Sequence, residues 1–139
     1  GGCIVCTTTE AESNNERLVL ENDHAMVICP FWSSSPYELL IMPKDHQQHL
    51  TDSSDDALAG VGLAVRDALK HLVATLGDIA FNLVFHTAPS HHEGTYHWHA
   101  HLFPKLTTTA GFERGTGVMI NIIAPEFAAG ELRRAAVGV

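Results

Sequence analysis

Five segments of the chain carry the residue pattern of β-strands. Short apolar runs bounded by proline, glycine or serine are typical of strands, and alternation of apolar and polar residues indicates a strand with one face in the core. These segments cover residues 24–30, 37–42, 80–86, 96–103 and 115–122. The polar stretch 8–16 is expected to be a loop or the edge of a hairpin, and residues 87–94 a second loop.

The stretch between Ser53 and Gly77 has the spacing of an amphipathic α-helix. Its apolar residues recur at intervals of three and four, which places them on one helix face. They are Leu58, Val61, Val65, Leu69, Leu72 and Leu76. Ser53 or Ser54 is expected to cap the helix start, and Gly77 to end the helix. A second helix is expected from Pro125 to about Ala136, since proline suits the first helical position.

The order of these elements predicts an α+β fold. We expect an antiparallel sheet of about five strands, with the long helix and the C-terminal helix on one face. With 139 residues, the chain has the length of one domain. Hydrophobic residues make up 45% and charged residues 17%, which excludes an intrinsically disordered chain. No apolar run approaches the roughly 18–20 residues of a membrane span, and no signal peptide is recognisable at the start.

The formal net charge of −8 narrows the choice of partners. An acidic chain is a poor match for bulk nucleic acid or for an anionic membrane, so neither is expected as a partner. A small phosphorylated ligand remains compatible with this charge, because helix termini and histidines bind phosphate locally.

The three cysteines point to metal chemistry more than to disulfides. An odd number of cysteines does not form a complete disulfide framework, so a cytoplasmic protein is expected. Cys3 and Cys6 have the Cys-x-x-Cys spacing of a metal site or a redox pair, and no thioredoxin-like context surrounds them. Cys29 follows two apolar residues and is expected to be buried.

Five of the ten histidines lie between His91 and His101. His97, His99 and His101 alternate with apolar residues, and on a strand alternate side chains share a face about 6.5–7 Å apart. The three imidazoles are therefore expected to line one surface and to reach the same ligand or neighbouring ones. The alternative is a solvent-exposed strand face that happens to be rich in histidine.

These motifs, in this order, resemble the histidine-triad (HIT) superfamily. The motifs are Cys3-Ile-Val-Cys6, Pro43-Lys44-Asp45-His46 and the His-x-His-x-His segment. Residues 85–89, 103–107 and 110–117 resemble the C-terminal HIT-like half of galactose-1-phosphate uridylyltransferase and its relatives. The resemblance runs from Cys3 to about Arg134. It implies a single HIT-like domain over residues 3–136, either free-standing or one half of a longer protein with two such halves.

The resemblance implies nucleotidyl transfer between a nucleotide sugar and a sugar phosphate, of the UDP-hexose:hexose-1-phosphate type. In catalytic halves of the family the middle histidine of the triad attacks the α-phosphorus and forms a nucleotidyl-histidine, which makes His99 the nucleophile here. His101 would then hydrogen-bond a phosphate oxygen. Phe112 and Glu113 resemble the aromatic-acid pair that holds the sugar, and His86 occupies a position that binds nucleotide.

Two departures from the catalytic pattern keep other activities open. His86 stands where catalytic HIT domains commonly carry asparagine, and Gly94 stands where they commonly carry serine. Both match the C-terminal half, in which histidines such as His86, His99 and His101 hold zinc or iron. One alternative is therefore a non-catalytic, metal-binding half-domain that serves dimerisation and sugar-phosphate binding. Others are a HIT-type nucleotide hydrolase and a metal-dependent hydrolase.

The resemblance also implies a structural zinc site. Related domains build it from a Cys-x-x-Cys pair, one further histidine and the first triad histidine, which are Cys3, Cys6, His46 and His97 here. Two thiolates and two imidazoles make a closed tetrahedral site. His49 is the competing third ligand, but His46 follows Pro-Lys-x as in the family pattern. HIT-type domains usually pair, so a homodimer is expected.

Overall fold

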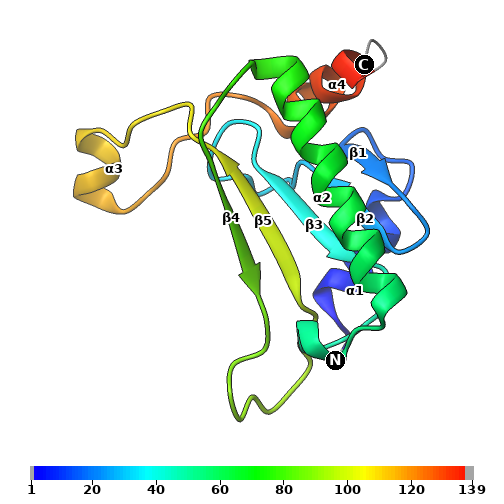
Figure 1. The fold of residues 1–139 in the computed structure, drawn as a ribbon. Coiled ribbons are helices and arrows are strands. Elements are labelled where there is room, and N and C mark those ends of the chain that lie inside the picture. Colours follow the sequence, from blue (N-terminus) through cyan, green and yellow to red (C-terminus); the bar gives the residue numbers. More distant parts are fainter. Residues whose placement is uncertain (1, 137–139) are drawn as a thin grey trace.

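Five antiparallel strands form one sheet, in the order β1-β2-β3-β5-β4 (Figure 1). The structure is a computed structural model that describes residues 2–136. The strands are β1 (Leu18–Glu21), β2 (Ala25–Ile28), β3 (Leu39–Pro43), β4 (Phe81–His86) and β5 (His99–Pro104). Since β4 lies at the edge of the sheet, five of its six residues are exposed, among them Phe81, Val84 and Phe85.

The sequence predicted four of these strands in the right places, but the fifth was wrong. The missing strand is β1, whereas residues 115–122 contain the end of helix α3 (Gly111–Thr116) and irregular chain. Gly117 ends this helix in the left-handed conformation, with φ of 71°. The first residues of this segment belong to a short α-helix that ends at glycine. The apolar run that follows is not a strand, because it pairs with none of the strands of the sheet.

The polar stretch 8–16 is also not the expected loop. Most of it belongs to helix α1 (Ile4–Glu12). The hydroxyls of Thr7, Thr8 and Thr9 donate to the backbone carbonyls four residues earlier, at 2.8–3.1 Å. Such hydrogen bonds let threonine satisfy its polar group inside a helix.

The two predicted helices are confirmed. Helix α2 (Asp55–Leu76) starts after Ser54, whose hydroxyl accepts a hydrogen bond from the backbone N–H of Ala57. It ends at Gly77, with φ of 78°. Helix α4 (Pro125–Ala136) follows the arm of the chain described below, and a 3₁₀ turn covers Leu50–Asp52. Within residues 2–136, none of these helices combines the length and the apolar character of a membrane span.

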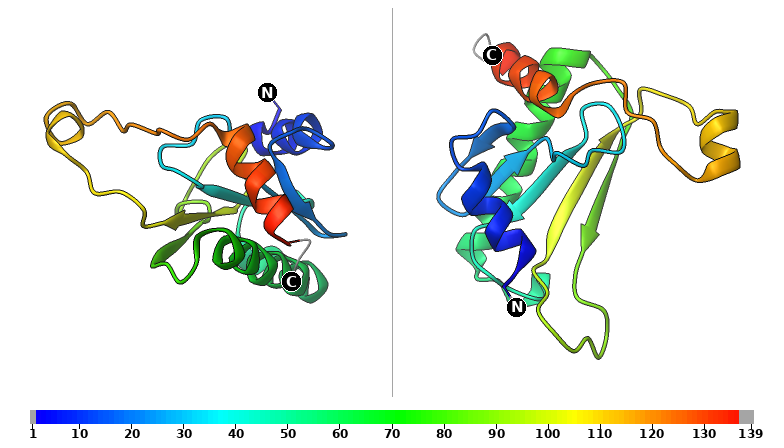
Figure 2. Two further views of the ribbon diagram at one scale, coloured as in Figure 1. Left: turned by 90° about the horizontal axis from the view of Figure 1, so that it is seen from above. Right: turned by 180° about the vertical axis from the view of Figure 1, so that it is seen from behind.

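Helices cover both faces of the sheet, not one. Helices α2 and α4 pack on one face, where Val27, Ile41, Ala100 and Leu102 meet Leu72 of α2. Helix α1 covers part of the other face, where its Val5 packs against a smaller apolar cluster (Figure 2). That cluster is formed by Met26, Ile28, Leu40 and Met42. The face under α1 is therefore apolar near β2 and β3 and becomes histidine-rich at β5.

Residues 105–124 form an arm that carries α3 away from the sheet (Figures 1 and 2). The arm exposes large apolar side chains. They are Leu106, Phe112, Val118, Met119, Ile120 and Ile122, of which Ile122 is 73% exposed. Apolar side chains gathered on a projecting segment are typical of a surface that contacts a partner.

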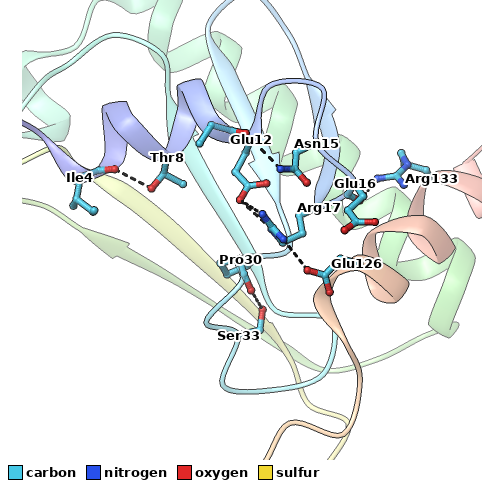
Figure 3. A network of polar contacts seen from close by, with 11 residues as sticks. Ile4, Thr8, Glu12, Asn15, Glu16, Arg17, Pro30, Ser33, Glu126 and Arg133 are labelled. Carbon is cyan, nitrogen blue, oxygen red and sulfur yellow. Dashed lines mark hydrogen bonds and ion pairs between the residues drawn. The ribbon is translucent and has the colours of Figure 1, made fainter.

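A polar network ties α1 to α4 (Figure 3). The guanidinium of Arg17 donates to Glu12 of α1 at 2.9 Å and to Glu126 of α4 at 2.8 Å. The Glu12 side chain is only 7% exposed, so Arg17 is the cation that makes its burial tolerable. The network thereby connects helices that lie more than a hundred positions apart in the chain.

We expect Arg17→Met to lower the free energy of unfolding by about 1–3 kcal/mol, because the buried Glu12 carboxylate loses its charged partner. Urea unfolding followed by circular dichroism measures this change. Arg66→Met is the matched control, since Arg66 pairs with Asp67 on the exposed surface of α2. Equal unfolding curves for the two variants would contradict a stabilising role of the Arg17 network.

Candidate metal centre and histidine site

Four side chains that are far apart in the sequence meet beside the start of α1. The ligand atoms of Cys3, Cys6, His46 and His97 all lie within 4.8 Å of one another. Nδ1 of His97 lies 3.7 Å from Sγ of Cys3 and 3.4 Å from Sγ of Cys6, and Nδ1 of His46 lies 3.4 Å from Sγ of Cys6. His49 is not in the group; its Nδ1 lies 3.4 Å from Oγ1 of Thr87. The structure therefore brings together the four residues named from the sequence, and this cluster can hold a metal ion.

The spacing suits a tetrahedral ion. Metal–sulfur bonds of about 2.3 Å and metal–nitrogen bonds of about 2.0–2.1 Å put a sulfur and a nitrogen ligand about 3.5 Å apart. Nε2 of His97 donates to the carbonyl of Pro43 at 2.9 Å. Nδ1, which faces the two thiols, therefore keeps its lone pair for a metal ion. Burial lowers the pKa of His97, and the carbonyl of Pro43 opposes this only in part, so the ring is favoured in the neutral form that a ligand needs.

The two thiols would be held as thiolates by such an ion. Cys3 and Cys6 are not joined in a disulfide. Burial raises the pKa of the Cys6 thiol, and the neighbouring Cys3 raises it further, so Cys6 without a metal favours the protonated form. Cys29, by contrast, is buried in the core as expected, and burial raises its pKa to about 12.

Strand β5 starts later than the sequence predicted, and this changes the set of histidines on its face. His97 lies before the strand, with its ring turned to the metal cluster. His86 of β4 is paired with His99 of β5, so that His86, His99 and His101 form the row of imidazoles. Their ring centroids are 5.0–5.3 Å apart. Within residues 2–136 their nitrogen atoms do not meet the spacing found in the Cys/His cluster.

One hydrogen bond determines which nitrogen of His99 is reactive. Nδ1 lies 2.9 Å from the backbone carbonyl of His97. A carbonyl only accepts, so Nδ1 carries the hydrogen and Nε2 carries the lone pair. Burial lowers the pKa of His99, and this outweighs the carbonyl of His97, which raises it. The ring therefore favours the neutral state, in which Nε2 is a nucleophile or a metal ligand.

Glu38 is a component of this site that sequence reasoning missed. Its Oε1 accepts from Nδ1 of His101 at 3.2 Å, and its Oε2 accepts from the backbone N–H of Ser34 at 2.7 Å and from the hydroxyl of Ser34 at 3.0 Å. Burial raises the pKa of the Glu38 carboxyl, but these hydrogen bonds outweigh it and leave the pKa below its ordinary value. The sequence feature that could have identified Glu38 is a single acidic residue directly before the apolar residues of β3.

An apolar cavity of about 160 Å³ opens beside two of the histidines. It lies between α1, the loop after β2, and strands β3 and β5. Its lining consists of Ile4, Val5, Thr8, Trp32, Leu40, Met42, His99 and His101. A largely apolar pocket with a few polar groups suits a small organic group, with the imidazoles in its lining.

The two residues expected to hold a sugar are not at this cavity. Phe112 and Glu113 lie on α3, which the arm carries away from strands β4 and β5 (Figure 1). Phe112 is 57% exposed, and the Glu113 carboxylate accepts from the backbone N–H groups of Ala110 and Ile120. Within one copy of the described chain, the structure does not bring them together with His86, His99 and His101.

The family model for the galactose-1-phosphate uridyl transferase C-terminal domain matches residues 7–117 of the chain. The chain belongs to this family. ADP-glucose phosphorylase of Arabidopsis thaliana is 31% identical over 96% of the chain, which covers 38% of that protein. Galactose-1-phosphate uridylyltransferase of Haemophilus influenzae is 32% identical over 68% of the chain, which covers 28% of that protein. The chain thus spans less than half the length of these curated relatives.

Solved structures support the same assignment of the fold. The crystal structure of the Arabidopsis ADP-glucose phosphorylase with bound ADP-glucose superimposes with a TM-score of 0.87 at 29% identity, over 96% of the chain and 43% of that protein. A Zn-bound histidine triad family protein from Mycobacterium smegmatis superimposes with a TM-score of 0.72 at 16% identity, over 99% of the chain and 94% of that protein. The predicted α+β, HIT-like fold of this uridyl transferase family member is therefore confirmed.

We expect the purified chain to hold about one equivalent of a divalent metal and Cys6→Ser to lose it, because a hydroxyl is a poor replacement for a thiolate ligand. Elemental analysis after desalting measures the content. Chelation should lower the thermal midpoint of the wild type by about 5 °C or more, since the metal joins α1 to the segment after β3. Cys29→Ser is the control and should keep its metal; a metal-free wild type would contradict this expectation.

Proposed function

We propose that the chain is the HIT-like domain of a nucleotidyltransferase that acts on nucleotide sugars and sugar phosphates, with His99 as the nucleophile. The observation that carries this proposal is the lone pair on Nε2 of His99 at the wall of an apolar cavity. Two relatives support nucleotide sugars and sugar phosphates as the substrate class: one is an ADP-glucose phosphorylase and the other a galactose-1-phosphate uridylyltransferase.

The reaction would proceed in two displacements at the α-phosphorus. Nε2 of His99 forms a bond to phosphorus, while the bond from phosphorus to the bridging oxygen breaks and the sugar phosphate leaves with that electron pair. The ring becomes cationic, and its Nδ1–H donates more strongly to the carbonyl of His97. A second phosphate oxygen then attacks phosphorus, the P–N bond breaks, and the lone pair returns to Nε2.

Zinc is the metal we propose for the Cys/His cluster. Two thiol and two imidazole ligands suit it, and a histidine triad neighbour is Zn-bound. The metal would have a structural role: it would fix His97, whose carbonyl in turn orients His99. Zinc or iron at a second site of His86, His99 and His101 would require the rings to rotate, because their nitrogens do not converge.

A homodimer in the cytoplasm, built from one HIT-like domain over residues 3–136, is the setting we propose. The exposed apolar arm supports a partner, because Phe112 and Glu113 at its helix would reach a pocket only in another copy or another half. The second candidate function is a non-catalytic half-domain that holds metal and lends this arm to a partner. The row of three neighbouring imidazoles favours that candidate.

Incubation with UDP-glucose or ADP-glucose is expected to add one nucleoside monophosphate to the protein, because Nε2 of His99 is free to attack. Intact-mass spectrometry measures the adduct. His99→Ala should abolish it, whereas His86→Ala should retain it with a reduced rate. Metal content is measured in the same samples as the control for folding. A metal-loaded protein that forms no adduct with either sugar nucleotide would favour the non-catalytic half-domain.

The rate of adduct formation should fall on the acid side with a midpoint below the ordinary histidine pKa of about 6.5. Burial lowers the pKa of His99, so the ring keeps its lone pair to lower pH and loses it as the pH falls through that lowered value. Single-turnover rates between about pH 5 and 8 test this. A midpoint at or above about 6.5 would contradict a desolvated His99 as the nucleophile.

A further inference from the structure

Glu38 is a buried carboxylate with each of its oxygens in use. It is 3% exposed and lies directly before β3, whose first residues Leu39 and Leu40 are apolar. One oxygen accepts from both the backbone N–H and the hydroxyl of Ser34, and the other accepts from His101. A carboxylate buried this deeply and held from two sides has a fixed orientation, so it can direct the group it touches.

The group it touches is the ring of His101. A carboxylate only accepts hydrogen bonds, so the hydrogen between the two lies on Nδ1 of His101. Stacking on Phe103, with centroids 5.4 Å apart and planes 4° from parallel, holds the ring at that angle. A ring with its single hydrogen on Nδ1 has its lone pair on Nε2, and His101 lines the apolar cavity together with His99.

We propose that Glu38, anchored by Ser34, is a positioning residue that keeps the hydrogen of the neutral His101 ring on Nδ1, so that the neutral ring offers the cavity a hydrogen-bond acceptor at Nε2. The neutral ring in this form does not donate to a phosphate oxygen, which is the role that the family resemblance implied for it. Its ligand is a donor, and in the cavity of a protein that binds nucleotide sugars the donor is a hydroxyl or a base N–H group. This last step rests on the proposed function, whereas the role of Glu38 toward His101 does not.

Glu38→Gln tests the assignment with almost no change of shape. Glutamine has one oxygen and one NH₂ group where glutamate has two oxygens. Its oxygen should stay with the backbone N–H of Ser34, which needs an acceptor, and its NH₂ group then faces Nδ1 of His101. Nδ1 must now accept, so the hydrogen of His101 should move to Nε2. Ser34→Ala is the matched control, because it removes one hydroxyl but keeps the carboxylate and the backbone N–H.

Long-range ¹H–¹⁵N spectra of the metal-loaded protein, recorded at alkaline pH where each ring carries one proton, report which nitrogen is protonated. We expect Nδ1–H for His101 in the wild type and in Ser34→Ala, and Nε2–H in Glu38→Gln. His99 is the internal standard and should show Nδ1–H in all three, because the carbonyl of His97 holds it. Nε2–H at His101 of the wild type, or an unchanged ring in Glu38→Gln, would overturn the role of Glu38.

Binding of ADP-glucose and UDP-glucose to the same samples, followed through the ring signals, tests the acceptor role. Glu38→Gln should bind about tenfold more weakly, the effect of losing about one hydrogen bond. Equal or tighter binding by Glu38→Gln would overturn the acceptor role and restore His101 as a donor. If no variant binds either sugar nucleotide, the proposed function fails, and the ring spectra still decide what Glu38 does.

Discussion

The hydrogen bond from Nε2 of His97 to the carbonyl of Pro43 is the contact on which the rest of the site depends. An imidazole has one hydrogen and one lone pair when neutral, so an acceptor on one side decides what the other side can do. With Nε2 committed to Pro43, Nδ1 faces the thiols of Cys3 and Cys6. The carbonyl of His97 accepts a hydrogen bond from Nδ1 of His99 and so leaves the lone pair of His99 on Nε2. The carbonyls of Pro43 and His97 are thus the two acceptors that connect the end of β3 to His99 on β5.

Most of the architecture could be predicted from local pattern. Helix α2 has regular apolar spacing, a serine cap and a terminal glycine, and each of these acts within a few residues. Strand β1 was missed because its signal is not local: it is a strand because Leu18, Leu20 and Glu21 pair with β2. Helix α1 was missed because its polar residues resemble a loop, although the threonine hydroxyls bond within the helix itself. In the arm, a strand was predicted where none forms, because its apolar residues have the pattern of a strand but do not pair with one.

The site, too, could be predicted from the sequence only in part. Motif order was sufficient to name Cys3, Cys6, His46 and His97 as a group, and the fold brings their ligand atoms together. Alternation alone suggested that His97, His99 and His101 share a face, but the strand starts at His99, and His86 comes from the neighbouring strand. Glu38 could not be found from spacing, because its importance lies in a contact with His101 across two paired strands.

The arm has a thermodynamic consequence for any complex it enters. Ordering the backbone of a residue costs about 1–2 kcal/mol in conformational entropy, and residues 105–124 form a long segment that carries its apolar side chains outward. A protein that already holds such a segment extended through its short helix α3 has met part of this cost before a partner arrives. Association through the arm would then convert more of its apolar contact area into affinity than a disordered tail of the same composition would. The hydrogen-bonded turns of α3, as much as the hydrophobicity of the arm, would contribute to the affinity for a partner.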